Sequence, residues 1–97
     1  MPYIVRWTDN AIDGLARIHV FLADIDPDVA QQALNAIGAG VDILEQFPNA
    51  GRPADDLEPD HHELLIPFGS SGYALFYEVT GETVLILAVK HQKEVGY

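Results

Sequence analysis

The sequence contains no cysteine and few basic residues, and both deficits exclude classes of function. Without cysteine, its 97 residues can form no disulfide framework, no thiolate zinc site and no cysteine nucleophile. Five Lys and Arg side chains stand against fifteen Asp and Glu side chains, which gives a formal net charge of -10. Nucleic-acid binding depends largely on Lys and Arg that neutralise phosphates, so we expect no broad electrostatic binding of RNA or DNA.

Long hydrophobic runs are also missing, which bears on where the protein acts. The longest apolar run, residues 84–89, is far shorter than the roughly 20 residues that a membrane-spanning helix requires. Residues 1–11 contain Arg6 and Asp9 where a signal peptide would have an apolar segment. We therefore expect a cytoplasmic protein without a membrane partner.

The composition that remains is that of a folded domain. Hydrophobic residues make up 48% of the chain, which excludes intrinsic disorder on composition despite the high net charge. A chain of this length can bury one modest core, but it is too short for two domains with a core each. We expect a single domain over residues 1–97, without a repeat or a linker.

The first half of the chain predicts a strand and two helices. Residues 3–7 are a β-branched and aromatic run, typical of a strand, and residues 8–10 are all good helix N-caps. Apolar residues then recur at spacings of three and four, and His19 falls on the same helix face, at the expected edge of the core. Residues 26–28 (Asp-Pro-Asp) are expected to end this helix and begin a second one that runs to Phe47. Helices joined so tightly form an antiparallel hairpin.

The second half of the chain predicts a loop and three strands. Residues 48–62 are polar and punctuated by proline, which indicates a loop. The expected strands are residues 63–68, 73–79 and 83–90, with a turn at 69–72 and a hairpin loop at 80–82. The last of these strands is apolar on both faces, as central strands are.

The order β-α-α-β-β-β predicts an α+β fold. In it, the helical hairpin packs on one face of a small, mainly antiparallel four-stranded sheet. Chain geometry leaves two positions open for the first strand, at one edge of the sheet or beside the last strand.

Two motifs add a family resemblance to this pattern. Residues 44–52 (Leu-Glu-Gln-Phe-Pro-Asn-Ala-Gly-Arg) have the form L-x-x-F-P-x-x-G-R, and residues 86–91 (Ile-Leu-Ala-Val-Lys-His) end the final strand as I-L-x-V-x-H. Together with chain length and element order, these motifs resemble the RelE/ParE superfamily, the toxins of type II toxin–antitoxin modules. The resemblance extends over nearly the whole chain, residues 3–97.

The resemblance implies a small toxin held inactive by a cognate antitoxin, with which it could form a hetero-oligomer. ParE-like members poison DNA gyrase without a known cleavage chemistry of their own, whereas RelE-like members cut messenger RNA in the ribosomal A site. Both kinds share the fold, so only the site can distinguish them. We expect the ParE-like kind, without a cofactor. The alternatives are a ribosome-dependent mRNA interferase, which would be a metal-independent endoribonuclease, and an inactive remnant that still binds the antitoxin.

The endoribonuclease alternative requires a general base, cations around the scissile phosphate and a proton donor. The resemblance places His91 where some relatives carry a catalytic histidine, a residue type suited to acid–base work near neutral pH. Arg52 and Lys93 would be the phosphate ligands, and Tyr97 would be a terminal hydroxyl donor. These four residues are the catalytic candidates under that alternative.

Departures from the family pattern favour binding over cleavage. His62 precedes Glu-Leu where many relatives have Arg, and residues 73–79 contain no Lys or Arg. The candidates for contact with the antitoxin or the target are Arg52, His62, Lys90, His91 and Lys93. Four of them have a purely structural alternative: Arg52 fixes its loop, His91 bonds to backbone at the strand end, and the two lysines are solvated edge charges. Tyr73 and Tyr77 are expected to be core rings.

A metal site is not expected. The candidate ligands would be Asp55, Asp60, His61 and His62. Adjacent histidines point in different directions in any regular structure, and no fourth ligand has a recognisable spacing.

Overall fold

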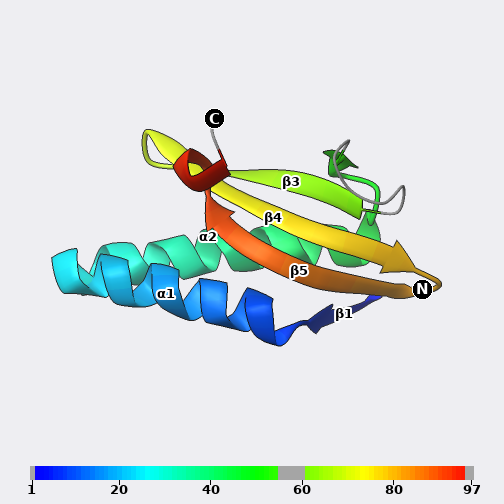
Figure 1. The fold of residues 1–97 in the computed structure, drawn as a ribbon, viewed down its shortest axis with the longest axis horizontal. Coiled ribbons are helices and arrows are strands. Elements are labelled where there is room, and N and C mark those ends of the chain that lie inside the picture. Colours follow the sequence, from blue (N-terminus) through cyan, green and yellow to red (C-terminus); the bar gives the residue numbers. More distant parts are fainter. Residues whose placement is uncertain (1, 55–60, 96–97) are drawn as a thin grey trace.

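A helical hairpin packs on one face of a twisted sheet (Figure 1). The computed structural model describes residues 2–54 and 61–95. Within them the elements are β1 (Ile4–Trp7), α1 (Asp9–Ile25), α2 (Pro27–Gln46), β2 (Arg52–Pro53), β3 (His61–Phe68), β4 (Ser71–Thr80), β5 (Thr83–His91) and the short 3-10 helix η1 (Gln92–Val95). The strand order is β1-β5-β4-β3-β2, with β1 parallel to β5 and each other neighbouring pair antiparallel. The predicted α+β fold is therefore confirmed.

Both helices begin where local capping chemistry predicts. The Thr8 hydroxyl accepts a hydrogen bond from the Ala11 N–H at 3.2 Å and donates one to the Ile86 carbonyl at 2.8 Å, which fixes the start of α1 to β5. Asp26 ends α1 and caps α2, because its side chain accepts from the Asp28 N–H at 2.9 Å. The resulting turn packs the two helices against each other as an antiparallel hairpin.

The buried face of α1 differs from the predicted one. The residues that this helix buries are Ala11, Gly14 and Ile18. Ile12 is 50% exposed and His19 is exposed, so the prediction that His19 lies at the edge of the core is wrong. The cause is the close approach of α1 to β5: a Cβ on Gly14 would lie 2.7 Å from the Val89 carbonyl oxygen. The helix turns its small residues toward the sheet, which rotates His19 outward.

The sheet has one more strand than the sequence predicts, and β5 is central as expected. In the described residues, β2 lies inside the segment predicted as a loop and pairs with β3, with Arg52 opposite Glu63. β3 begins at His61, two residues earlier than predicted. β1 is both an edge strand and the neighbour of β5, so the two positions left open for it are the same position.

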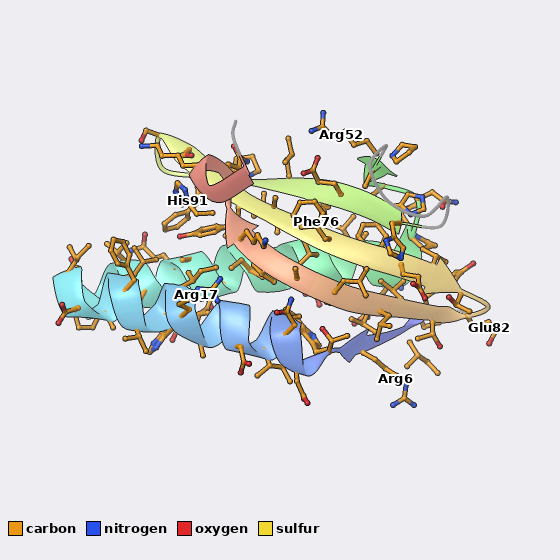
Figure 2. All side chains as sticks on the ribbon, in the orientation of Figure 1. Arg6, Arg17, Arg52, Phe76, Glu82 and His91 are labelled. Atoms are coloured by element: carbon orange, nitrogen blue, oxygen red, sulfur yellow. The ribbon has the colours of Figure 1, made fainter. Side chains whose placement is uncertain are left out.

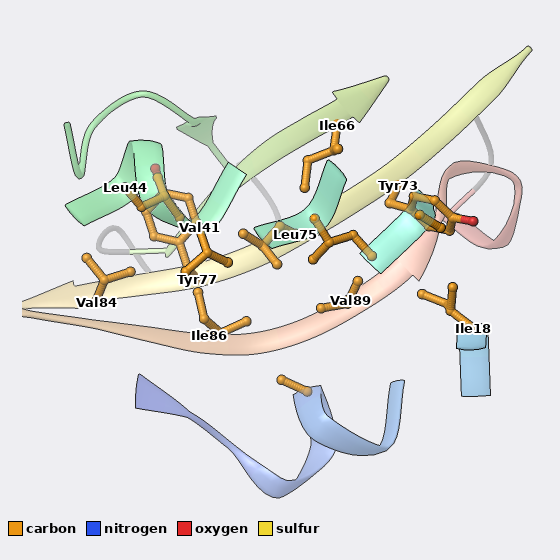
Figure 3. Close-up of a cluster of buried hydrophobic side chains, with 13 residues drawn as sticks. Ile18, Val41, Leu44, Ile66, Tyr73, Leu75, Tyr77, Val84, Ile86 and Val89 are labelled. Atoms are coloured by element: carbon orange, nitrogen blue, oxygen red, sulfur yellow. The ribbon is translucent and has the colours of Figure 1, made fainter. Parts of the chain in front are cut away.

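Alternate residues of the central strands point into the core between the sheet and the hairpin (Figure 3). The largest fully buried side chains are Tyr77, Ile37, Leu44, Leu75, Ile86, Val84 and Val89. A bulge keeps this alternation in register: Phe76 pairs with Ala88 and Tyr77 with Ile86, so Leu87 is the extra residue in β5. Among the described helices, none is long and apolar enough to span a membrane.

Candidate functional site

Arg52 contacts a buried carboxylate. Its Nε lies 2.8 Å and its Nη2 lies 2.6 Å from Oε1 of Glu63. The Glu63 side chain is 6% exposed, whereas that of Arg52 is 57% exposed. A buried carboxylate without a counter-charge is costly, so the guanidinium offsets the desolvation of Glu63 and joins β2 to β3. This contact commits much of the Arg52 charge to a role inside the fold.

The Tyr77 hydroxyl holds the loop that leads into β2. It donates to the Pro48 carbonyl at 2.7 Å and accepts from the Gly51 N–H at 2.9 Å, and Tyr77 itself is 0% exposed. Burial raises the pKa of Tyr77, and the hydrogen bond from Gly51 partly opposes that rise. Gly51 is required by space, because a Cβ there would lie 2.7 Å from both the Tyr77 hydroxyl and the Glu63 carbonyl oxygen. Tyr77 therefore acts as a neutral anchor for residues 48–51.

The two adjacent histidines of β3 point to opposite faces of the sheet. His61 Nε2 lies 2.9 Å from Glu78 Oε2, while the His62 ring stacks on Tyr77 with centroids 5.2 Å apart. No group of three or more potential metal ligands is found among the described residues. Asp55 and Asp60, the other two residues considered as ligands, lie outside those residues.

A groove of about 680 Å³ opens at another part of the molecule, where α1 faces the β3–β4 turn and the end of β5. Its basic and ring-bearing lining residues are Arg17, Phe21, Phe68, Tyr73, His91 and Lys93. The His91 ring meets Tyr73 edge-on with centroids 5.5 Å apart, and its Nδ1 accepts from the Lys93 backbone N–H at 3.2 Å. Burial raises the pKa of Tyr73. The groove thus combines aromatic walls with two basic side chains and an imidazole.

The residues predicted as catalytic do not all come together. His91 and Lys93 share the groove, but Arg52 lies apart from them (Figure 2). His91 pairs with Tyr73 in β4, whereas Arg52 pairs with Glu63 and Glu63 with Phe76. Three strand spacings across the sheet and three residues along it separate the two backbones by roughly 17 Å.

The remaining predicted site residues are also divided. His62 lies on the ring of Tyr77, whereas Arg52 contacts Glu63, the next residue of β3, on the opposite face of the sheet. Lys90 alternates with His91 along β5 and so points to the face away from the helices. Tyr97 lies outside the described residues. Arg17 was missed, because its sequence position on α1 gives no sign that this helix face meets the end of β5.

Comparison with known families identifies the chain. Residues 5–96 match the family described as the ParE toxin of the type II toxin–antitoxin system parDE. The chain belongs to the ParE toxin family. Toxin RelE1 of Caulobacter vibrioides is 32% identical over 94 residues, which cover 97% of this chain and 98% of that protein. Toxin RelE3 of the same bacterium is 29% identical, over 82% of this chain and 84% of that protein.

Solved toxin structures have the same architecture. A chain from the chromosomal ParDE system of P. aeruginosa superposes with a TM-score of 0.75 at 26% identity, covering 92% of this chain and 95% of that one. A chain of the toxin–antitoxin complex RelBE2 of Mycobacterium tuberculosis superposes with a TM-score of 0.58 at 25% identity, covering 94% of this chain and 99% of that one. A mutant of E. coli toxin RelE in the free state superposes with a TM-score of 0.65 at 18% identity, covering 97% of this chain and 87% of that one, which shows the fold alone. The predicted membership of the RelE/ParE superfamily is confirmed, and the protein is a type II toxin of that superfamily.

Proposed function

We propose that this ParE-family toxin acts by binding a protein target, DNA gyrase, and that a cognate antitoxin neutralises it. The observation that carries the proposal is that Arg52 lies apart from the groove that Arg17, His91 and Lys93 line. Arg52 is bound to Glu63, Lys90 points away from the helix side, and β4 contains no Lys or Arg. A binding mechanism needs no single point at which these charges meet.

Cleavage of RNA makes stricter demands than binding. Cations must converge on one phosphate to stabilise the developing charge, together with a base and an acid. Here the separation of roughly 17 Å between the backbones of Arg52 and His91 divides the cations between two places. The net charge of -10 would also repel RNA at long range. Both features favour a protein target.

The antitoxin partner is supported by similarity and by the surface. The ParDE and RelBE2 neighbours both come from toxin–antitoxin systems. Near the connection between the helices, Val20, Phe21 and Ile25 are 67%, 68% and 70% exposed. Large apolar side chains grouped on a surface are typical of a protein-binding site. Because the toxin is acidic, we expect the antitoxin to contact most of it through basic residues.

The test is DNA supercoiling by purified gyrase, with this protein titrated to stoichiometric excess. We expect inhibition that is relieved by the protein encoded in the neighbouring reading frame, while that protein alone leaves gyrase unaffected. Full gyrase activity in the presence of the folded toxin would contradict the gyrase target. Failure of the two proteins to form a complex would contradict the antitoxin.

A second candidate, ribosome-dependent RNA cleavage, is favoured by one observation, the RelE names of the two Caulobacter relatives. It is tested by message cleavage on translating ribosomes, with His91→Ala as the variant and Lys90→Ala, on the opposite sheet face, as its control. Cleavage that disappears only with His91→Ala would replace the gyrase proposal. Intact messages with the unaltered protein would remove this candidate.

A further inference from the structure

The helical hairpin contains a large share of the negative charge of the chain. Residues 9–46, which form α1, α2 and the turn between them, contain seven carboxylates and one base. The carboxylates are Asp9, Asp13, Asp24, Asp26, Asp28, Asp42 and Glu45. The base, Arg17, lines the groove and already has a partner. Within the described residues, none of the seven carboxylates forms a salt bridge, so the charge of the hairpin is not neutralised inside the fold.

Helical spacing places four of these carboxylates on the side of the hairpin that points away from the sheet. Asp13 and Asp24 are eleven residues, about three turns, apart on α1, and Asp28 and Asp42 are fourteen residues, about four turns, apart on α2. All four are exposed, whereas the buried residues of each helix face the sheet. No described element covers this side of the hairpin (Figure 1). We call the surface formed by these four side chains the hairpin face.

Helix electrostatics explains some of the acidic residues but not others. The helix dipole stabilises a carboxylate in the first turn, as it does for Asp28 at the start of α2. Asp24 lies in the last turn of α1 and Glu45 in the last turn of α2, where the dipole favours a cation, and neither last turn contains a basic residue. These two carboxylates therefore oppose helix stability slightly, and their placement favours contact with a cationic partner.

Apolar side chains beside the hairpin face indicate that this partner is a protein. Val20, Phe21 and Ile25 are 67%, 68% and 70% exposed, and Asp24 lies among them in the sequence. A metal ion or a polyamine would leave these apolar side chains in water. Apolar residues grouped with charged ones are typical of a protein interface.

We propose that the hairpin face docks on the DNA-binding surface of gyrase and places its carboxylates where DNA phosphates would lie. The inference rests on the proposed function, because it specifies which surface of that target the toxin covers. A surface that binds duplex DNA presents Lys and Arg to the phosphates, so its charge is complementary to that of the hairpin face. A second copy of the chain is a poorer occupant, since each copy brings a net charge of -10.

The dimensions of the hairpin face suit an extended cationic surface. The carboxylates of α1 span roughly 16 Å along the helix and those of α2 roughly 21 Å, and the axes of packed helices lie about 8–10 Å apart. Two rows of negative charge can therefore meet several Lys or Arg side chains at once. Their attraction to a cationic surface acts at long range and weakens as salt rises.

This assignment makes the toxin a competitor of DNA. Because toxin and DNA would neutralise the same basic residues, gyrase should hold one or the other. The first test titrates the toxin into gyrase that holds a fluorescently labelled duplex and follows the anisotropy of the label. We expect release of the duplex, with a midpoint that rises as the DNA concentration is raised. Retention of DNA on gyrase that has bound the toxin would overturn the inference.

The second test compares two charge reversals in the supercoiling assay. Asp24→Lys and Glu82→Lys change the net charge equally, and both side chains are exposed. Glu82 lies in the turn between β4 and β5, at the opposite end of the molecule from the connection between the helices (Figure 2). We expect Asp24→Lys to raise the half-inhibitory toxin concentration about tenfold or more, and Glu82→Lys to raise it far less. Equal effects would show that net charge alone matters and would overturn the assignment.

The third test separates binding from folding. Asp24→Lys places a cation in the last turn of α1, so its Tm should equal or exceed that of the unaltered protein although its inhibition is weaker. Asp24→Glu keeps the charge and should keep the inhibition. Equal losses of inhibition in both variants, or full inhibition by Asp24→Lys, would overturn the role of this carboxylate.

The failure of this inference and the failure of the proposed function give different results. If the unaltered, folded toxin leaves supercoiling by gyrase unchanged, both fail together. If it inhibits supercoiling while the labelled duplex stays on gyrase, the inference fails alone and the gyrase target stands.

Discussion

Removal of one oxygen atom, by Tyr77→Phe, tests how the segment before β2 is held. The Tyr77 hydroxyl donates to the Pro48 carbonyl and accepts from the Gly51 N–H, at 2.7 and 2.9 Å in a buried site. Phenylalanine keeps the ring but leaves both backbone groups without their partner. An unsatisfied buried polar group costs about 1–3 kcal/mol, so the pair should cost about 2–6 kcal/mol.

The assay is thermal and urea unfolding followed by circular dichroism. In a domain of this size 1 kcal/mol corresponds to about 4–8 °C in Tm, so we expect a fall of at least about 8 °C. Tyr73→Phe is the matched control, because Tyr73 is also a core ring, 3% exposed, but its edge lines the groove. The Gly51 amide should also exchange with solvent faster in Tyr77→Phe. Equal small shifts for both variants would refute the anchoring role of the hydroxyl.

Three further perturbations test other contacts of the fold. Gly38→Ala should raise the free energy of unfolding by about 0.5–1 kcal/mol, since a Cβ there meets nothing within 4 Å. Gly14→Ala should instead lower the free energy of unfolding, because its Cβ would clash with the backbone of β5. Thermal unfolding of each variant shows whether the two changes have opposite signs. Arg52→Ala should cost about 1–3 kcal/mol in urea unfolding at pH 7, and adding Glu63→Gln should recover most of that loss, because the carboxylate is then no longer buried without a counter-charge. Burial raises the pKa of Tyr77, so the native state keeps the Tyr77 hydroxyl protonated to higher pH than the unfolded state does. The contribution of the protonated hydroxyl to stability should therefore be complete below about pH 10 and be lost as pH rises above that value. A pH series of urea midpoints that is flat up to pH 11 would contradict this sign.

The parts of the fold that depend on neighbouring residues could be predicted from the sequence. Thr8 and the Asp-Pro-Asp sequence at residues 26–28 determine the helix boundaries through capping contacts with residues two or three positions away. The central position of β5 followed from its apolar residues on both faces. Each of these signals is contained in a short stretch of sequence.

The parts that depend on distant contacts could not be predicted. β2 is held by Arg52 on Glu63 and by the loop anchored on Tyr77, which are 11 and 26 residues away from their partners. The face that α1 buries depends on how closely Gly14 approaches β5. Hydrophobic periodicity does not report either contact.

The same distinction applies to the candidate site. His91 and Lys93 lie together because they are two residues apart, at the end of β5 and the start of η1. Arg17 joins them from α1, more than seventy residues earlier in the chain, and only the tertiary structure brings it there. Arg52, expected with them under RNA cleavage, is held elsewhere by Glu63.

The central claim, that this toxin acts on gyrase, is tested most directly by plasmid topology in cells after induction without the antitoxin. Topoisomers are resolved on chloroquine gels, while the integrity of a reporter message is followed in the same samples. The account predicts loss of negative supercoiling before any message is cut, and no such loss when the antitoxin is induced as well. Unchanged supercoiling together with cleaved messages would contradict it.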